Sequence, residues 1–184
     1  PLLLPLPLHL LLLLLPYTGF SQHLNIMISD QNDPNEPSIA INPKNTNELV
    51  AASNISNYYY STDGGLTWTW NILTSTYGVW GDPVIACDTA ENFYFFHLSN
   101  PPFGSWIDRI VCQRTSGPGQ AWNNGSFTGL NGNKAQDKHW VDIDRTNNTI
   151  YMTWTEFDDY GSFSPLDSSR ILFSKSTDTG NTWS

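Results

Sequence analysis

Carboxyl groups stand at the starts of three short apolar segments, where they could catalyse acid–base chemistry. Glu36, Asp82 and Asp137 each stand at the beginning of such a segment, and His139 follows the last by two residues. Carboxyl groups that lie close together raise one another's pKa, so one can donate a proton while another acts as a base. Glycoside hydrolysis uses such a pair, and a histidine could add a third titrating group. Alternatively, these acidic residues only cap strand starts in solvated turns.

Aromatic and basic side chains occur beside the same positions. Trp80 stands in the turn before the second segment, and Lys138 and Trp140 flank His139 in the third. An aromatic face packs well against the apolar face of a sugar ring, so Trp80, Trp140 and the more distant Trp106 are candidates for substrate binding. Lys138 is a further candidate. Tryptophan is found as often in packing between sheets.

Each apolar segment is predicted to be the first strand of a four-stranded antiparallel sheet, because a polar turn and then a second β-rich run follow it. The second runs are 49–52, 93–98 and 150–155, and the third runs are 58–61, 109–114 and 170–176. No segment shows a sustained helical period. The chain is therefore predicted to be all-β, and the length of its repeats is typical of β-propeller blades.

An eight-residue pattern, S-x-D-x-G-x-T-W, follows two of the third runs. The first octet is 61–68 and the second octet is 176–183; a degenerate copy at 115–122 keeps only the central Gly and the final Trp. An Asp carboxylate can accept N–H groups across a tight turn, and Gly permits a positive φ there. The residues predicted to hold these turns are Ser61, Asp63, Gly65, Thr67, Trp68, Ser176, Asp178, Gly180, Thr182 and Trp183.

The octets resemble the Asp box, the bacterial neuraminidase repeat of sialidases and other secreted β-propellers. The resemblance covers about 35–183 and implies a six-bladed propeller, of which about three blades are present, at about 35–80, 81–136 and 137–184. It also implies a secreted, carbohydrate-directed glycoside hydrolase of the exo-sialidase kind. Sialidases carry an arginine in an Arg-Ile-Pro segment of the first inner strand, where this chain has Glu36-Pro37-Ser38-Ile39.

A non-catalytic propeller that binds a glycan or a protein is the alternative function. The sialidase acid/base Asp lies between that first segment and the first octet, but 41–60 contains neither Asp nor Arg. Sialidases also use a Tyr nucleophile, assisted by Glu, and two further arginines, all of which belong to later blades. Glu36, Asp82, Asp137 and His139 therefore remain as the candidate catalytic groups.

The first 22 residues are predicted to be a truncated signal peptide, because they begin with an apolar run of Leu and Pro. The run is short for a membrane span and is interrupted by proline. We therefore expect a protein that is secreted or displayed on the cell surface, with residues 23–184 forming part of a propeller.

The formal net charge of −9 disfavours nucleic acid as a partner. A glycan is the expected ligand. Cys87 and Cys112 are predicted to be free thiols, since one strand should separate them. No cofactor or metal is predicted; the oxygen-rich segment 30–36 could bind calcium but lacks the spacing of an EF-hand loop.

One long loop is a further candidate region. An acidic stretch at 156–160 opens a Gly- and Ser-rich excursion that runs to Ser169. Long loops in compact domains often carry function, so this one could overhang the pocket. It could equally be solvated.

Overall fold

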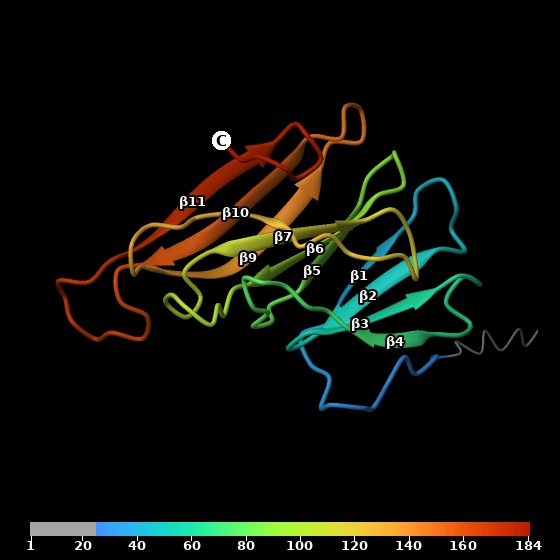
Figure 1. Ribbon diagram of the computed structural model, residues 1–184, viewed down its shortest axis with the longest axis horizontal. Helices are drawn as coiled ribbons and strands as arrows, with labels where there is room; N and C mark the ends of the chain where they lie inside the picture. Colours follow the sequence, from blue (N-terminus) through green and yellow to red (C-terminus); the bar gives the residue numbers. More distant parts are fainter. Residues whose placement is uncertain (1–24) are drawn as a thin grey trace, which may run out of the picture.

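The computed structural model describes residues 25–184, which form three antiparallel sheets (Figure 1). The first sheet contains β1 (Ser38–Ile41), β2 (Leu49–Ser53), β3 (Asn57–Ser61) and β4 (Thr69–Ile72), in that order. The second sheet contains β5 (Val84–Cys87), β6 (Phe93–Leu98), β7 (Ile110–Thr115) and β8 (Ser126–Thr128), in that order. The third sheet contains β9 (Ala135–Ile143), β10 (Ile150–Phe157) and β11 (Ser169–Ser176).

The sheets lie side by side, with the second between the other two (Figure 1). Strand β6 explains this arrangement of the sheets, because all six of its residues are buried. Successive side chains of a strand point to opposite faces. Accordingly, Phe93 and Phe95 pack in a core with residues of the first sheet, whereas Tyr94 and Phe96 pack in a core with residues of the third. A strand that is apolar on both faces thus joins its neighbours into one structure.

The tryptophans that end the octet-like turns connect neighbouring sheets. Trp122, in the degenerate copy, makes edge contacts with Tyr58 of the first sheet and Phe95 of the second, with ring centroids 5.7 and 6.0 Å apart. Trp183 of the second octet contacts Phe96 of the second sheet at 6.1 Å. Each of these rings therefore helps to fix the orientation of one sheet against the next.

The predicted second and third runs are confirmed as strands, with boundaries that differ by no more than two residues. Strand β9 begins at Ala135, two residues before the predicted start of the third blade. The third sheet has three strands among the described residues, and the three sheets do not close into a ring. The total number of blades therefore stays a prediction. The predicted signal peptide, residues 1–22, lies outside the described residues.

Cys87 and Cys112 are confirmed as free thiols. They lie on β5 and β7, and β6 separates these two strands in the sheet. Cys112 is fully buried, whereas Cys87 is half-buried. Residues 25–184 contain no helix that is long and apolar enough to cross a membrane.

Candidate functional site

The first strands of the three sheets, β1, β5 and β9, are neighbours and begin at the same end of the molecule. A non-glycine residue with positive φ stands at the equivalent position of each: Glu36 (51°), Asp82 (50°) and Lys138 (47°). This left-handed conformation is unfavourable for residues other than Gly, and such strain occurs preferentially at functional sites. The chain thus repeats one uncommon backbone geometry at the point where the three strands converge.

A β-bulge explains why Asp137 joins this group although Lys138 occupies the equivalent position. Trp140 pairs with Thr153 and Asp137 pairs with Thr155, so Lys138 and His139 together oppose the single residue Trp154. Bulges change the direction of side chains near active sites. The sequence-based assumption that Glu36, Asp82 and Asp137 occupy equivalent positions is therefore corrected, although the three carboxyl groups still converge.

The carboxyl groups of Glu36 and Asp82 form a hydrogen-bonded pair. Burial raises the pKa of Asp82 to about 7, and the carboxylates of Glu36 and Asp137 add to this effect. The hydrogen bond with Asp82 lowers the pKa of Glu36. The positive charge of Lys138 lowers both pKa values. Asp82 is therefore about half protonated at pH 7, whereas Glu36 is ionised there.

Asp82 and Asp137 line a cleft of about 210 Å³ whose walls are aromatic. Trp80 and Trp106 lie edge to face in it, with ring centroids 6.0 Å apart. Tyr160 contacts Trp106 in the same way at 5.3 Å. The charge of Asp137 raises the pKa of the Tyr160 phenol. The cleft thus combines a protonated carboxyl group, a second carboxyl group and three aromatic rings.

Asn54, in the turn between β2 and β3, holds the start of β5 in place. Its Oδ1 accepts the backbone N–H of Asp82 at 2.8 Å, and its Nδ2 donates to Asn35 Oδ1 at 3.0 Å. A Cβ on Gly81, which has φ +98°, would lie only 2.2 Å from Asn54 Oδ1. Glycine is therefore required at position 81 for this close approach.

The loop that carries Tyr160 is anchored by charged side chains. Lys134 and Arg170 both contact the Glu156 and Asp158 carboxylates; the closest N–O distances to Lys134 and Arg170 are 2.9 and 2.5 Å. The hydrogen bonds to Arg170 are the principal cause that lowers the pKa of Asp158. Tyr160, at the start of this loop, lines the cleft, whereas residues 161–169 do not line it and are mostly exposed.

Four candidate residues are not among those that line the cleft: Glu36, Lys138, His139 and Trp140. His139 is buried and contacts Phe96, with ring centroids 6.5 Å apart. Burial lowers its pKa to about 3, so it is neutral at physiological pH. Trp140 is 68% exposed and does not line the cleft.

The octets form matching hydrogen-bonded turns away from the cleft. In the first, Asp63 accepts Ser61 Oγ at 2.7 Å and the Thr67 N–H and hydroxyl at 2.9 and 2.6 Å. Asp178 accepts the corresponding groups of Ser176 and Thr182 at the same distances. The hydrogen bonds from the threonine lower the pKa of each aspartate to about 2. Both aspartates therefore stabilise turns.

No group of three or more His, Cys, Asp or Glu within residues 25–184 has the geometry to hold a metal ion. This applies to the acidic cleft and to segment 30–36, the calcium alternative considered from the sequence.

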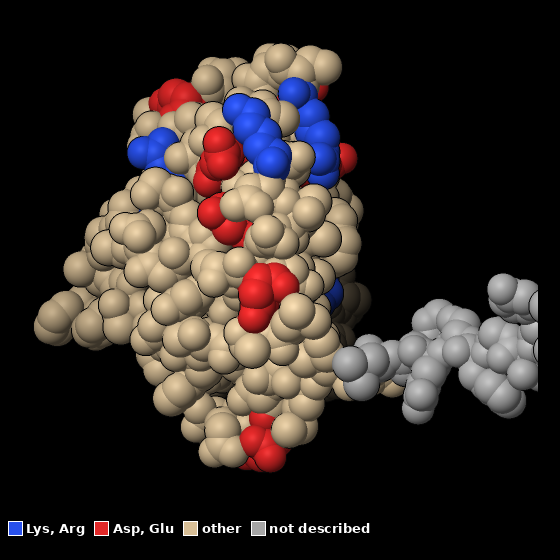
Figure 2. Space-filling view, turned by 90° about the vertical axis from the view of Figure 1, so that its right-hand side faces the viewer, with Lys and Arg blue, Asp and Glu red and all other residues tan. Residues whose placement is uncertain are grey.

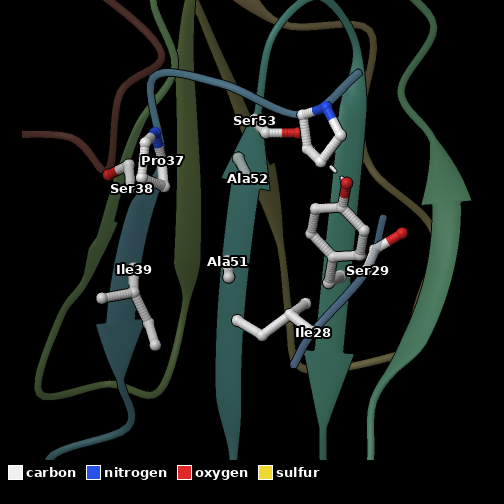
Figure 3. Close-up of a pocket in the computed structure, with 10 residues that line it drawn as sticks. Ile28, Ser29, Pro37, Ser38, Ile39, Ala51, Ala52 and Ser53 are labelled. Atoms are coloured by element: carbon white, nitrogen blue, oxygen red, sulfur yellow. Dashed lines mark hydrogen bonds between the residues drawn. The ribbon is translucent and has the colours of Figure 1, made fainter. Parts of the chain in front are cut away.

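An apolar pocket of about 310 Å³ lies on the outward face of the first sheet (Figure 3). The segment that carries Ile28 and Ser29 crosses this face, and Ile28, Ile39 and Ala51 point into the pocket. Its polar groups are hydroxyls, such as those of Ser53 and Tyr59, which lie 3.1 Å apart. Within the described part of the chain, no carboxyl, amine or imidazole side chain lines this pocket, so these residues do not supply the groups needed for acid–base chemistry.

Surface charge gives no indication of a nucleic-acid site on the face shown in Figure 2. Acidic side chains occur along the length of that face, and basic side chains gather toward its upper end. This distribution agrees with the net charge of −9.

Sequence reasoning did not include Tyr160 and Asn54 among the candidate site residues. Tyr160 follows an acidic stretch in a long loop, which was the available signal. Asn54 stands in a short turn between two strands, and its role depends on a contact with Asp82, 28 residues away. The sequence contained no local signal for that contact.

No protein-family model matches the sequence, and no curated protein matches it. Two solved structures are similar: an α-L-arabinanase of Penicillium chrysogenum in complex with arabinobiose, and an α-L-arabinofuranosidase of Fusarium graminearum in complex with an iminosugar inhibitor. Their TM-scores are 0.55 and 0.54, at 14% and 13% identity; each alignment covers 79% of this chain and 47% of the other. The chain thus spans about half the length of these structures. The likeness shows the fold alone, that of sheets arranged as the blades of a β-propeller.

Proposed function

We propose that this protein is a glycoside hydrolase that acts on neutral sugars through the cleft between Trp80, Trp106 and Tyr160. The observation that carries the proposal is Asp82, a carboxyl group whose pKa is raised to about 7 and which lines the same cleft as Asp137. Glycosidases need one carboxyl group that is protonated at working pH and a second that is not.

In the proposed reaction, Asp82 donates its proton to the oxygen of the scissile glycosidic bond. Asp137 lines the same cleft and is the second carboxyl group: acting as a base, it removes a proton from a water molecule whose oxygen bonds to the anomeric carbon as the bond to the leaving oxygen breaks. Glu36 is a positioning residue, because it accepts a hydrogen bond from Asp82 and raises its pKa before the substrate binds. The aromatic rings hold the sugar.

The charge of the cleft supports a neutral substrate. No Arg or Lys is among the residues that line it in the described part of the chain. An anionic sugar such as sialic acid would meet two carboxyl groups without a guanidinium to pair with it, which is unfavourable. In this proposal, the resemblance of the octets to the Asp box of sialidases supports only the fold. The charge of the residues that line the cleft indicates the substrate class.

The two structurally similar enzymes suggest the first sugar to test. Their names describe an arabinanase and an arabinofuranosidase. We therefore propose α-L-arabinofuranosides as the first substrates, and we propose export from the cell on the basis of the predicted signal peptide.

The test is hydrolysis of fluorogenic arabinofuranoside, xyloside and sialoside by the full-length protein. Release from a neutral glycoside that is lost in Asp82→Asn would support the proposal. Cleavage of the sialoside alone would contradict the neutral substrate. Inactivity on all three, together with binding of oligosaccharide, would favour the non-catalytic propeller.

A further inference from the structure

A second pocket lies next to the cleft and shares one of its walls. It has a volume of about 460 Å³ and is formed by the segment before β1, the turn after β2, and β4. Asn54 and Ile55 line both this pocket and the cleft. The two hollows therefore adjoin at these two residues, and together we call them the groove. We refer to the second pocket as the amide pocket, after Asn32, Asn35, Asn54 and Asn57, which line it.

The amide pocket has a preformed polar floor. Asn57 is 3% exposed, and its Oδ1 accepts Trp70 Nε1 at 3.0 Å and Asn32 Nδ2 at 3.3 Å. Its Nδ2 donates to the carbonyl of Asn54 at 2.7 Å. These hydrogen bonds fix the orientation of both the amides and the tryptophan ring before any ligand arrives. Preorganised groups lose less conformational entropy on binding.

Apolar surface remains exposed above this floor. Trp70, Ile72 and Ile55 are 45%, 46% and 47% exposed, although all three line the pocket. Amide groups that can both donate and accept hydrogen bonds, beside an exposed indole face, suit the alternating hydroxyl and C–H surfaces of a sugar ring. Among residues 25–184, Asp33 is the one ionisable residue that lines the pocket.

The volumes of the cleft and of the amide pocket indicate that one ligand occupies both. The cleft alone, at 210 Å³, lies below the range of about 300–1,000 Å³ that is usual for ligand sites, whereas the amide pocket lies within it. A ligand confined to the cleft would be about as small as one sugar ring. A longer chain could place its reactive unit beside Asp82 and extend over Asn54 to Trp70.

We infer that the amide pocket is a distal sugar-binding subsite, so that the preferred ligand is a neutral oligosaccharide rather than a single terminal sugar. This inference rests on the proposed function for the reaction at Asp82. The amide pocket contributes affinity through Trp70 and the asparagine amides and takes no part in proton transfer.

The test measures binding of arabinobiose and arabinopentaose to full-length protein that carries Asp82→Asn, by calorimetry. Because this variant is not expected to hydrolyse its ligand, the affinity is independent of turnover. We expect the pentasaccharide to bind about tenfold more tightly than the disaccharide, a difference of about 1.4 kcal/mol. Adding Trp70→Ala should remove this difference, and Trp70→Phe should retain part of it. Equal affinity for both sugars, or no binding of either, would overturn the inference.

Trp140→Ala is the matched control, since Trp140 is also exposed but lies outside the groove. It should leave the ratio of the two affinities unchanged. A loss of this ratio in the control would also contradict the assignment of Trp70. If Trp70→Ala does not fold, Asn32→Ala, which alters an exposed residue of the pocket, provides the same comparison.

The two proposals can fail separately. Length-dependent binding by a protein that hydrolyses no glycoside would refute the catalytic proposal and retain the subsite. Hydrolysis of the fluorogenic glycoside, together with an oligosaccharide affinity that does not depend on chain length, would refute the subsite and retain the catalytic proposal.

Discussion

Asp82 and the octet aspartates have the same side chain but opposite pKa shifts. Asp82 lies in a partly desolvated cleft beside two other carboxyl groups, and its pKa is raised to about 7. Asp63 and Asp178 are half-buried and accept several hydrogen bonds in a turn, and their pKa values fall to about 2. The comparison teaches that the surroundings of a carboxyl group, rather than its residue type, decide whether it can donate a proton at neutral pH.

The largest expected effect comes from removing the proton of Asp82. Asp82→Asn should lower kcat/KM on the best neutral glycoside by about 10²–10⁴-fold, the usual contribution of a general acid. Asp63→Asn is the matched control, because it changes the same residue type in an octet and should leave the rate of the folded protein unchanged. Steady-state kinetics measures both. Equal losses in the two variants would remove the distinction between the two kinds of aspartate.

The second-largest effect should be the pH dependence of activity, which reports the protonation of Asp82. Since its pKa is raised to about 7, the active protonated form is lost as the pH increases through 7. The rate should then fall by about tenfold per pH unit. Glu36→Gln removes a charge that helps to raise this pKa, so the decline should begin at a lower pH. A profile that does not move in this variant would contradict the assigned pair.

A smaller effect should distinguish the two octets from each other. Trp183 contacts the buried Phe96 of the neighbouring sheet, whereas Trp68 is in neither apolar core. Trp183→Ala should reduce the free energy of unfolding by about 2–3 kcal/mol, somewhat less than a fully buried aromatic ring. Trp68→Ala should cost under about 1 kcal/mol. Denaturant unfolding monitored by circular dichroism measures both, and similar losses would refute a role of Trp183 between sheets.

The last comparison concerns stability at acid pH. Burial lowers the pKa of His97 and His139 to about 4 and about 3, from an ordinary value of 6.5. The unfolded chain therefore binds protons first, and stability should decrease as the pH falls below about 6.5. Asp63 and Asp178 have lowered pKa values, so their contribution is present above about pH 4 and is lost between pH 4 and 2.

Variants can separate these two pH ranges. His97→Gln should weaken the decrease between pH 6.5 and 4, and the double variant Asp63→Asn with Asp178→Asn should weaken the decrease below pH 4. Thermal unfolding at a series of pH values measures both. The assignment would be wrong if either variant altered the other range instead.

Much of the fold could be predicted because its signals are local. The octets contain both the hydrogen-bonding groups and the glycine that their turns need, and the apolar runs of β6 and β10 give their positions directly. Glu36, Asp82 and Asp137 could also be proposed together, because repeated strands place equivalent ends at one side of the molecule. Trp80 and Trp106 were candidates for the same reason, and the structure places both in the cleft.

The positions of His139 and Trp140 could not be predicted, because a strand has two faces and its pattern does not show which neighbour each face meets. A bulge opposite Trp154 also shifts the pairing of β9, and this changes which residue is equivalent to Asp82. No feature of the sequence near Lys138 identifies that bulge.

The sequence by itself determined the all-β architecture, the repeated turns and the set of acidic residues at the strand starts, since each depends on neighbouring residues and on backbone preferences. Only the tertiary structure decided that Asp82 carries the proton, that Tyr160 completes the cleft and that Asn54 separates it from the amide pocket. Desolvation and charge interactions act between residues that are far apart in the chain, so they exist only after the sheets have packed against one another.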